Sequence, residues 1–371
     1  MTIAITGATG FLGSRILHRL LSETGGEPLV LLGRDTPAVL GERIRKAVEW
    51  LDVPGALPPD AFGRIHCLQV DVSRPGLGLS AGELALATEG LSTVWHCAAS
   101  TAQYGDPLTI HRANVLGTRG VLQFADHAPD AHVIHLSTAF VAGRRTAGHV
   151  LESDLCERAG FHTPYEESKF TAERIVRHWS SAHGRTVTVI RPSVVVEDRF
   201  VPDGLAQHPF GTLARFVREA LRARTPASDR SLAGGRVAGV LRFRFPAPPG
   251  GSLNLVPADH AVRAMIGAAA AHRSPGVLTV HVTHPVNTPT TTIARAFESS
   301  HPGLVVELTP AVPDPTSLET HVRQTHGDLL GYAALRRTYD RTHLLSCPGV
   351  PPDPPPVDAG YLARGLAPGR D

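Results

Sequence analysis

Short, almost wholly apolar runs alternate with longer amphipathic stretches over the first two hundred residues. The apolar runs are rich in β-branched residues, as strands buried on both faces of a sheet are. They lie at residues 2–6, 28–32, 64–70, 92–98, 132–137 and 186–192. The intervening stretches repeat apolar residues at helical spacing, as at Leu12, Ile16, Leu17, Leu20 and Leu21. This alternation predicts an α/β fold with a Rossmann-type, doubly wound parallel sheet.

Beyond residue 200 the pattern changes, because glycine, proline and arginine become frequent and the strand signals become short. We therefore expect a core over 1–197 and a smaller C-terminal region, mainly for substrate binding, over 198–345. Parts of 250–290 are expected to return to the core. The composition of residues 346–371 predicts a proline-rich tail.

Within the C-terminal part, local patterns predict individual elements. Residues 261–271 have the pattern of a helix and 278–282 that of a strand. Residues 317–345 predict a long helix or a helix pair. Residues 243–251 are expected to be a loop, and the prolines of 347–356 exclude a helix there.

The composition is that of a globular protein with a buried core. The chain has 371 residues, of which 42% are hydrophobic, and 36 basic against 34 acidic side chains leave a net charge of +2. This near balance gives no reason to expect nucleic acid or a membrane as a partner. There is no CxxC pair, no apolar run of about 18 residues and no signal peptide, so we expect a cytoplasmic protein. The histidines lack metal-ligand spacing, and no metal is expected.

A glycine-rich segment, TGATGFLG, joins the first predicted strand to the first predicted helix. In such a segment glycines permit a sharp turn, close approach of backbone N–H groups to a pyrophosphate, and tight packing of helix against sheet. The helix N-terminus adds further donors and a positive dipole end. We therefore expect a dinucleotide site, the alternative being a tight turn that binds no ligand. Its expected residues are Gly7, Thr9, Gly10, Phe11, Leu12 and Gly13.

Two strand ends bear on the choice of dinucleotide. The second strand ends at Gly33 and Arg34, whose guanidinium can pair with a 2′-phosphate, and this favours NADPH over NADH. The alternatives are an ordinary surface arginine and a helix N-cap at Asp35. After the third strand, Asp71 can accept a hydrogen bond from the adenine amino group while Val72 contacts the ring. A turn-capping role is the alternative for Asp71.

Tyr165 and Lys169 form a YxxxK pair, which on a helix places both side chains on one face. An ammonium one turn away favours the phenolate, so we expect a lowered pKa for Tyr165 and a role in proton transfer. Lys169 is notable because only it and Lys46 are lysines among the 36 basic residues. The strand-end hydroxyls of Ser137 and Thr138 are expected in the same crevice, where one can donate to a developing oxyanion.

Asn114 is a polar residue in an otherwise apolar stretch of a predicted helix, in the sequence HRANVLGT. Its amide could hold a water molecule that relays protons to the site. The alternative is a buried amide that kinks the helix.

Taken in order, these motifs resemble an extended short-chain dehydrogenase/reductase. The matching segments are TGATGFLG, DV at Asp71, HCAAS from His96, NVLGT at Asn114, ST at Ser137, YEESK, and RPSVV from Arg191. LQVDVSRPGLGLS, HLSTAFVAG, YEESKFTAER and NLVPADHAV further resemble the branch that holds thioester reductase domains and fatty acyl-CoA reductases. Together these segments cover roughly residues 1 to 265.

The resemblance implies roles for further residues. Thr138 rather than Ser137 would be the catalytic hydroxyl, and Ala139 with Phe140 would contact substrate. The cofactor would be lined by Ala98, Ala99, Pro192, Ser193 and Val194. The sequence departs from the family after Arg191-Pro192-Ser193, where VVVEDRFVPDG replaces a glycine-bearing loop, so residues 198–248 are where we expect substrate selectivity.

The resemblance implies an NADPH-dependent reductase that converts a thioester to an aldehyde, or onward to an alcohol. Because the first strand begins at Thr2, we expect the acyl group to arrive on coenzyme A or on a separate carrier protein. A homodimer is also expected. Two alternatives stay open: an enzyme of the same superfamily that acts on a ketone, an aldehyde or a sugar nucleotide, and a non-catalytic NADP-binding regulator.

Overall fold

A computed structural model describes residues 1–23, 25–52, 55–103, 105–224 and 240–367. Within this part of the chain, seven parallel strands form a central sheet in the order β12-β7-β5-β4-β1-β2-β3. The strands are β1 (Thr2–Thr6), β2 (Leu29–Gly33), β3 (Ile65–Gln69), β4 (Leu91–His96), β5 (His132–Leu136), β7 (Thr186–Pro192) and β12 (Gly276–Val282). The chain order reverses between β1 and β4, which is where open α/β sheets bind ligands. The Rossmann-type sheet predicted from the sequence is confirmed.

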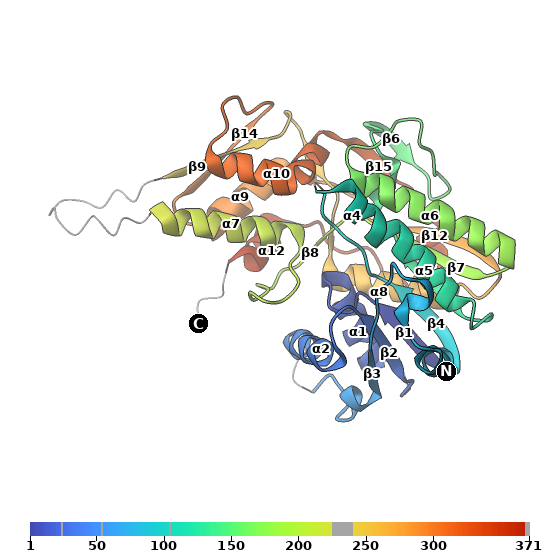
Figure 1. Cartoon of the computed structure of the whole chain (residues 1–371). Coiled ribbons are helices and arrows are strands. Elements are labelled where there is room, and N and C mark those ends of the chain that lie inside the picture. Colours follow the sequence, from blue (N-terminus) through green and yellow to red (C-terminus); the bar gives the residue numbers. More distant parts are fainter. Residues whose placement is uncertain (24, 53–54, 104, 225–239, 368–371) are drawn as a thin grey trace.

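Helices cover both faces of this sheet (Figure 1). They are α1 (Phe11–Glu23), α2 (Pro37–Leu51), α3 (Ala81–Thr88), α4 (Pro107–His111), α5 (Gly117–Ala125), α6 (Pro164–His183) and α8 (Ala258–Ala271). On one face Leu17 of α1 and Met265 of α8 belong to one apolar cluster. On the other face Phe124 of α5 and Val176 of α6 belong to another. The doubly wound arrangement follows from the amphipathic patterns of these helices.

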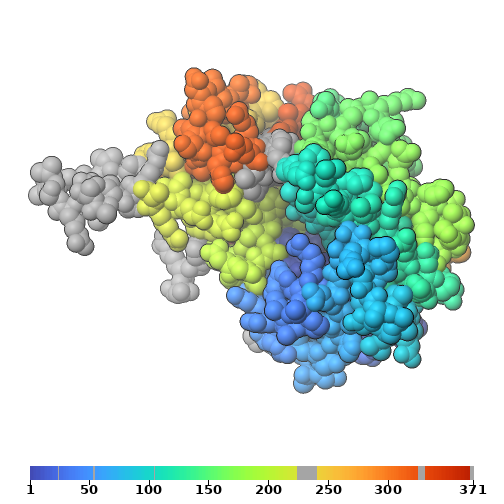
Figure 2. All heavy atoms as spheres, viewed as in Figure 1, coloured from blue at the N-terminus to red at the C-terminus, as the bar shows by residue number. Residues whose placement is uncertain are grey.

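A second region packs around its own core. It contains α7 (Pro209–Arg224), β9 (Leu241–Pro246), α9 (Thr290–Ser300), β14 (Leu304–Thr309), α10 (Ser317–Gly331) and α12 (Ala359–Leu366). Phe210, Phe297, Val322 and Leu362 from four of these helices share a buried cluster. In the space-filling view the yellow α7 segment and the orange α10 segment lie together, apart from most of the blue N-terminal segment (Figure 2).

Short elements connect the two regions. Three further strand pairs are β6 (Ala147–Val150) with β15 (Arg336–Tyr339), β8 (Val194–Val196) with β11 (Leu255–Pro257), and β10 (Ser252–Leu253) with β13 (Thr288–Pro289). The remaining helical turns are Ala61–Arg64, Pro75–Gly78, Arg112–Leu116, Ala139–Ala142, Tyr332–Ala334 and α11 (Thr342–Ser346). The chain thus returns to the first region through β11, α8 and β12.

Three local predictions need correction in part. The expected loop at 243–251 begins inside β9, which pairs with β14. The long helix or helix pair expected over 317–345 is two helices, α10 and α11, with the unpredicted strand β15 between them, which pairs with β6. In both cases a partner distant in the chain outweighs the local pattern. The expected tail contains α12, whose Leu362 is buried in the second core.

Candidate active site

A cavity of about 440 Å³ lies at the carboxyl ends of the central strands, against the start of α7. Its wall brings together many residues singled out from the sequence. They are Gly7, Gly10, Phe11, Leu12, Gly13, Ala99, Thr138, Phe140, Tyr165, Lys169, Pro192, Ser193 and Val194. The glycine loop and the YxxxK pair, far apart in sequence, therefore face one space.

Two glycines of the loop, Gly7 and Gly13, leave no room for a side chain. Gly7 has a φ of +72°, and a Cβ there would lie 2.6 Å from the Ala98 nitrogen. A Cβ on Gly13 would lie 2.1 Å from the Gly7 carbonyl oxygen. Gly7, Gly10 and Gly13 line the cavity at the N-terminus of α1, and the first turn of that helix holds no acidic residue. This is the cradle that a pyrophosphate requires.

Two neighbouring hydroxyls at the end of β5 have different partners. Ser137 Oγ donates to the buried Glu173 carboxylate at 3.0 Å. Thr138 caps the turn that follows, where its Oγ1 accepts a hydrogen bond from the Phe140 nitrogen at 3.3 Å, and it also hydrogen-bonds with Tyr165. The geometry therefore puts Thr138 rather than Ser137 beside the tyrosine.

Tyr165 lies in the first turn of α6. The helix begins there because Thr163 accepts a hydrogen bond from the Glu166 nitrogen and Pro164 occupies the first helical position. Burial raises the pKa of Tyr165 to about 12, and the hydrogen bond with Thr138 only partly opposes this. The lowered pKa predicted from the YxxxK spacing is therefore wrong for this structure.

Lys169 follows one turn later and is only 3% exposed. Its Nζ donates to the Leu136 carbonyl oxygen at 2.6 Å, which fixes the ammonium at the end of β5. Burial lowers the pKa of Lys169 to about 8, while the charge of Glu173 opposes the shift. The surroundings of Lys169 thus bring its pKa close to neutral pH.

Glu173, a further turn along α6, is a buried residue that the sequence analysis missed. Arg191 donates to both of its oxygens, at 3.0 and 2.6 Å, and Arg177 donates at 2.8 Å. Burial alone would raise the pKa of Glu173, but these guanidiniums outweigh it and hold the pKa below its usual range. The i, i+4, i+8 spacing of Tyr165, Lys169 and Glu173 was the available signal.

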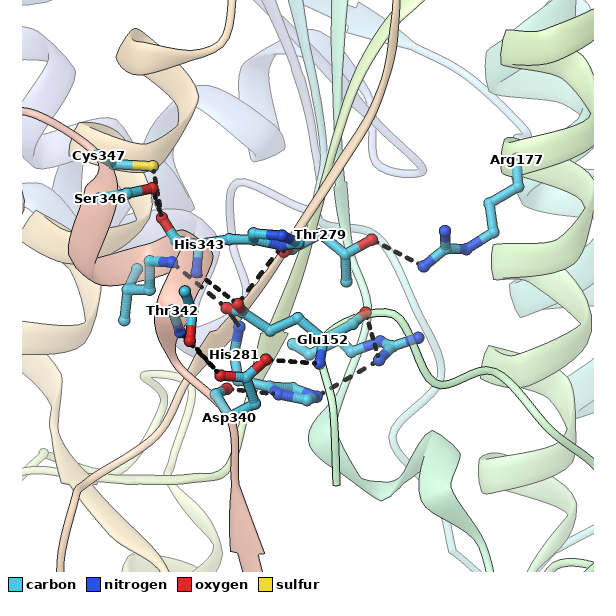
Figure 3. Close-up of polar contacts among 11 residues, drawn as sticks. Glu152, Arg177, Thr279, His281, Asp340, Thr342, His343, Ser346 and Cys347 are labelled. Carbon is cyan, nitrogen blue, oxygen red and sulfur yellow. Dashed lines mark hydrogen bonds and ion pairs between the residues drawn. The ribbon is translucent and has the colours of Figure 1, made fainter. Parts of the chain in front are cut away.

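A second buried carboxylate, Glu152, fastens the C-terminal segment to this scaffold (Figure 3). It accepts hydrogen bonds from the His281 nitrogen at 2.8 Å and from the His343 nitrogen at 2.7 Å. Its carbonyl oxygen accepts a hydrogen bond from Arg191 at 3.3 Å. Glu152 therefore joins residues of β12, α11 and the end of β7.

Asn114 does not line the cavity. It lies in a π-helical turn between α4 and α5, where its Nδ2 donates to Ser168 Oγ at 2.8 Å and to the Ser100 carbonyl. Its Oδ1 accepts a hydrogen bond from the Ser100 nitrogen at 2.7 Å. The structure thus supports the helix-kinking alternative over the water-holding role, because the amide already bonds to the protein.

Several other expected contacts lie outside the cavity. Arg34 is exposed, and Asp35 pairs with Arg43 rather than capping α2, whose N-cap position is Thr36. Asp71 takes the turn-capping role, since Oδ1 accepts hydrogen bonds from the nitrogen and hydroxyl of Ser73. The other predicted residues outside the cavity wall are Thr9, Val72, Ala98 and Ala139.

The cavity wall also contains residues that the sequence analysis did not name. Tyr332 stacks on Phe140 with ring centroids 4.0 Å apart, and its hydroxyl donates to Glu166 at 2.7 Å. The others are Cys97, Thr101, Gln103, Leu136, Val195, Ala206, Gln207, His208, Pro209 and Thr212, and Ser137, which the sequence predicts in this crevice, also lies in the wall. Tyr332 belongs to a stretch without any motif, so no local signal could have placed it here.

Neither a cluster of metal ligands nor a membrane-spanning helix is found in the described ranges. No three histidine, cysteine, aspartate or glutamate residues there gather as metal ligands. No helix in the same ranges is long and apolar enough to cross a bilayer.

Together, the fold and the cavity define an NAD(P)-binding Rossmann protein of the extended short-chain dehydrogenase/reductase type. More particularly, the family model of the male sterility protein matches residues 5–265, and the chain belongs to this family. The resemblance found in the sequence is therefore confirmed.

Individual relatives fit this assignment. The chain is 26% identical over 299 residues to the Drosophila melanogaster fatty acyl-CoA reductase wat, covering 72% of this chain and 53% of that protein. It is 31% identical over 196 residues to an isonitrile lipopeptide synthase of Streptomyces coeruleorubidus, covering 52% of this chain and 13% of the synthase. The chain thus spans about half or less of these relatives.

A solved structure gives the same fold. The terminal R domain of the myxalamid PKS-NRPS pathway superposes with a TM-score of 0.74 at 23% identity, covering 98% of this chain and 89% of that domain.

Proposed function

We propose that the protein is an NADPH-dependent reductase that converts a carrier-bound or CoA-bound thioester to an aldehyde. The observation that carries the proposal is the family match over residues 5–265, which includes both the glycine loop and the Thr138, Tyr165 and Lys169 set facing one cavity. A relative matched over 299 residues, a fatty acyl-CoA reductase, supports a thioester rather than a ketone.

The residues present fit a dinucleotide. The Gly7–Gly13 loop would hold the pyrophosphate with backbone N–H groups, and the Lys169 ammonium would hold the nicotinamide ribose. Arg34, exposed at the end of β2, would pair with a 2′-phosphate, which is the reason for NADPH over NADH. When bound, the reduced nicotinamide supplies a hydride.

The protein's own groups act on the carbonyl oxygen. Thr138 and Tyr165 would donate hydrogen bonds to it, so that negative charge developing there is stabilised as the carbonyl carbon accepts the hydride. Tyr165 then gives its proton to that oxygen, and the nearby Lys169 ammonium favours the resulting phenolate. From a thioester this yields a hemithioacetal, which releases the thiol and leaves the aldehyde. A second round of the same chemistry would give the alcohol.

We also propose that the acyl group is delivered on coenzyme A or on a carrier protein, since the relatives' names include a fatty acyl-CoA reductase and a lipopeptide synthase. The homodimer expected from the resemblance stays a prediction that light scattering can check.

The experiment is a substrate panel followed by absorbance of the reduced nicotinamide. Purified protein is mixed with NADPH and an acyl-CoA, an acyl-carrier thioester, an aldehyde, a ketone or a UDP-sugar. We expect turnover with a thioester. Turnover of a ketone or a sugar nucleotide without any thioester activity would replace the proposal with the corresponding alternative.

A further inference from the structure

His208 is a buried polar side chain whose function none of the contacts explains. It is 1% exposed and lines the cavity wall. Neither Nδ1 nor Nε2 has a hydrogen-bond partner among the residues that the structure describes. A buried polar group without a partner costs free energy, so a ligand that completes it is the natural explanation.

The position of His208 points to one part of the cavity. It directly precedes α7, and its ring lies 5.7 Å from the ring of Phe11, centroid to centroid. Phe11 is the first residue of α1 and belongs to the glycine loop. His208 therefore belongs to the C-terminal region and lies near the N-terminal end of α1, where the glycine loop would hold phosphate.

The segment that carries His208 is held firmly against the first region. Glu197, at its start, pairs with the buried Arg15 of α1 at 2.7 Å. Gln207 Nε2 closes the loop by donating to the carbonyls of Val201 and Pro202 at 2.9 and 3.1 Å. The loop that carries the imidazole is thus held in place by contacts within the protein, and such preorganisation favours binding.

The chemistry available to His208 is that of a neutral donor. Burial, with a smaller contribution from the Arg15 charge, lowers the pKa of His208 to about 3. The ring is therefore uncharged near neutral pH and offers one N–H and one acceptor nitrogen. A phosphate oxygen has only acceptor character and matches the N–H.

We propose that His208 is a cofactor-binding residue contributed by the C-terminal region, whose ring N–H donates to a phosphate oxygen of the dinucleotide held by the Gly7–Gly13 loop. The proposal rests on the NADPH dependence proposed above. The segment that leads from β8 to α7, within the region where substrate selectivity is expected, would then also contact the cofactor.

The test measures NADPH binding directly, by fluorescence titration without any acyl substrate. His208→Phe keeps the ring contact with Phe11 but loses the N–H, whereas His208→Asn keeps a donor in a smaller side chain. His301→Phe is the matched control, because His301 is also buried with Nε2 unpartnered among the described residues but packs on α9, away from the cavity. Thermal unfolding without ligand checks the fold of each variant.

We expect His208→Phe to raise the Kd for NADPH at least roughly tenfold, because a hydrogen bond to a charged group is lost. His208→Asn should recover part of that loss and His301→Phe should leave the Kd within twofold. An unchanged Kd in folded His208→Phe would overturn the proposal. So would an unchanged Kd with a raised KM for thioester, which would assign His208 to the acyl side. Absence of NADPH binding by the unaltered protein would instead contradict the proposed function.

Discussion

Replacement of Lys169 by arginine keeps the positive charge but changes the shape of the cationic group. The substitution tests why position 169 holds a lysine in a chain whose basic residues are nearly all arginines. Lys169 is 3% exposed and its Nζ lies 2.6 Å from the Leu136 carbonyl oxygen. A larger, planar guanidinium cannot take that position without displacing its neighbours, which costs about 1–3 kcal/mol in a packed site.

The magnitude follows from the contact that is lost. A charge-assisted hydrogen bond is worth about 1.5–3 kcal/mol, which corresponds to roughly a 10- to 150-fold lower rate of reduction if it is lost in the transition state. Lys46 is exposed on α2, and Lys46→Arg should change the rate less than about twofold. The assay is single-turnover oxidation of NADPH with saturating thioester, with thermal unfolding to confirm that both variants fold. If the rate of Lys169→Arg lies within twofold of that of the unaltered protein, the shape of the cation at position 169 does not limit the reaction.

Three further outcomes are expected. Tyr165→Phe should lower kcat by roughly 10²–10⁴-fold, as loss of a general acid does, with NADPH affinity nearly unchanged in a titration. The rate should fall as the pH rises through about 8, because Lys169, whose pKa is lowered to about 8, then loses its charge. Tyr165, with a pKa of about 12, stays protonated over this range. A rate that stays constant to pH 10, or a pH profile that is unchanged in Lys169→Met, would contradict this assignment. Glu173→Gln should lower the free energy of unfolding by about 3–5 kcal/mol in a denaturant titration, since two guanidiniums lose their buried counter-charge, and a change below about 1 kcal/mol would speak against that network. The pKa of Glu173 is lowered in the fold, so its stabilisation is present near neutral pH and is lost as the pH falls below the ordinary glutamate range.

The sequence was most informative where local pattern and local chemistry coincide. The strands of the main sheet are continuous apolar runs, and 2–6 and 186–192 match β1 and β7 residue for residue. The glycine loop was equally readable, because the steric demand at Gly7 and Gly13 arises within a single turn. Such features need no knowledge of distant partners.

The C-terminal region was less predictable because its elements depend on distant partners. β9 and β15 become strands only by pairing with β14 and β6. Tyr332 and His208 enter the cavity through packing of that region on the first, and neither stands in a motif. Neighbouring residues in the sequence do not carry this information.

The pKa of Tyr165 could not be predicted from the spacing of the YxxxK pair for a related reason. The YxxxK pair predicts proximity of charge and phenol, yet the pKa of Tyr165 is set first by burial. Burial is a property of the whole packed site, to which β4, β5, α6 and the C-terminal region all contribute. Asn114 is similar, since its partners Ser100 and Ser168 lie in other segments.

In the proposed reaction, a hydride passes in this cavity from the reduced nicotinamide to the carbonyl carbon of a thioester. The most direct measurement uses NADPH deuterated at the transferring position, an acyl thioester, and mass spectrometry of the product. We expect an aldehyde, or the derived alcohol, that carries deuterium on the former carbonyl carbon, and we expect this product to be lost in Tyr165→Phe. Recovery of unreduced thioester alone, from protein shown to bind NADPH, would contradict it.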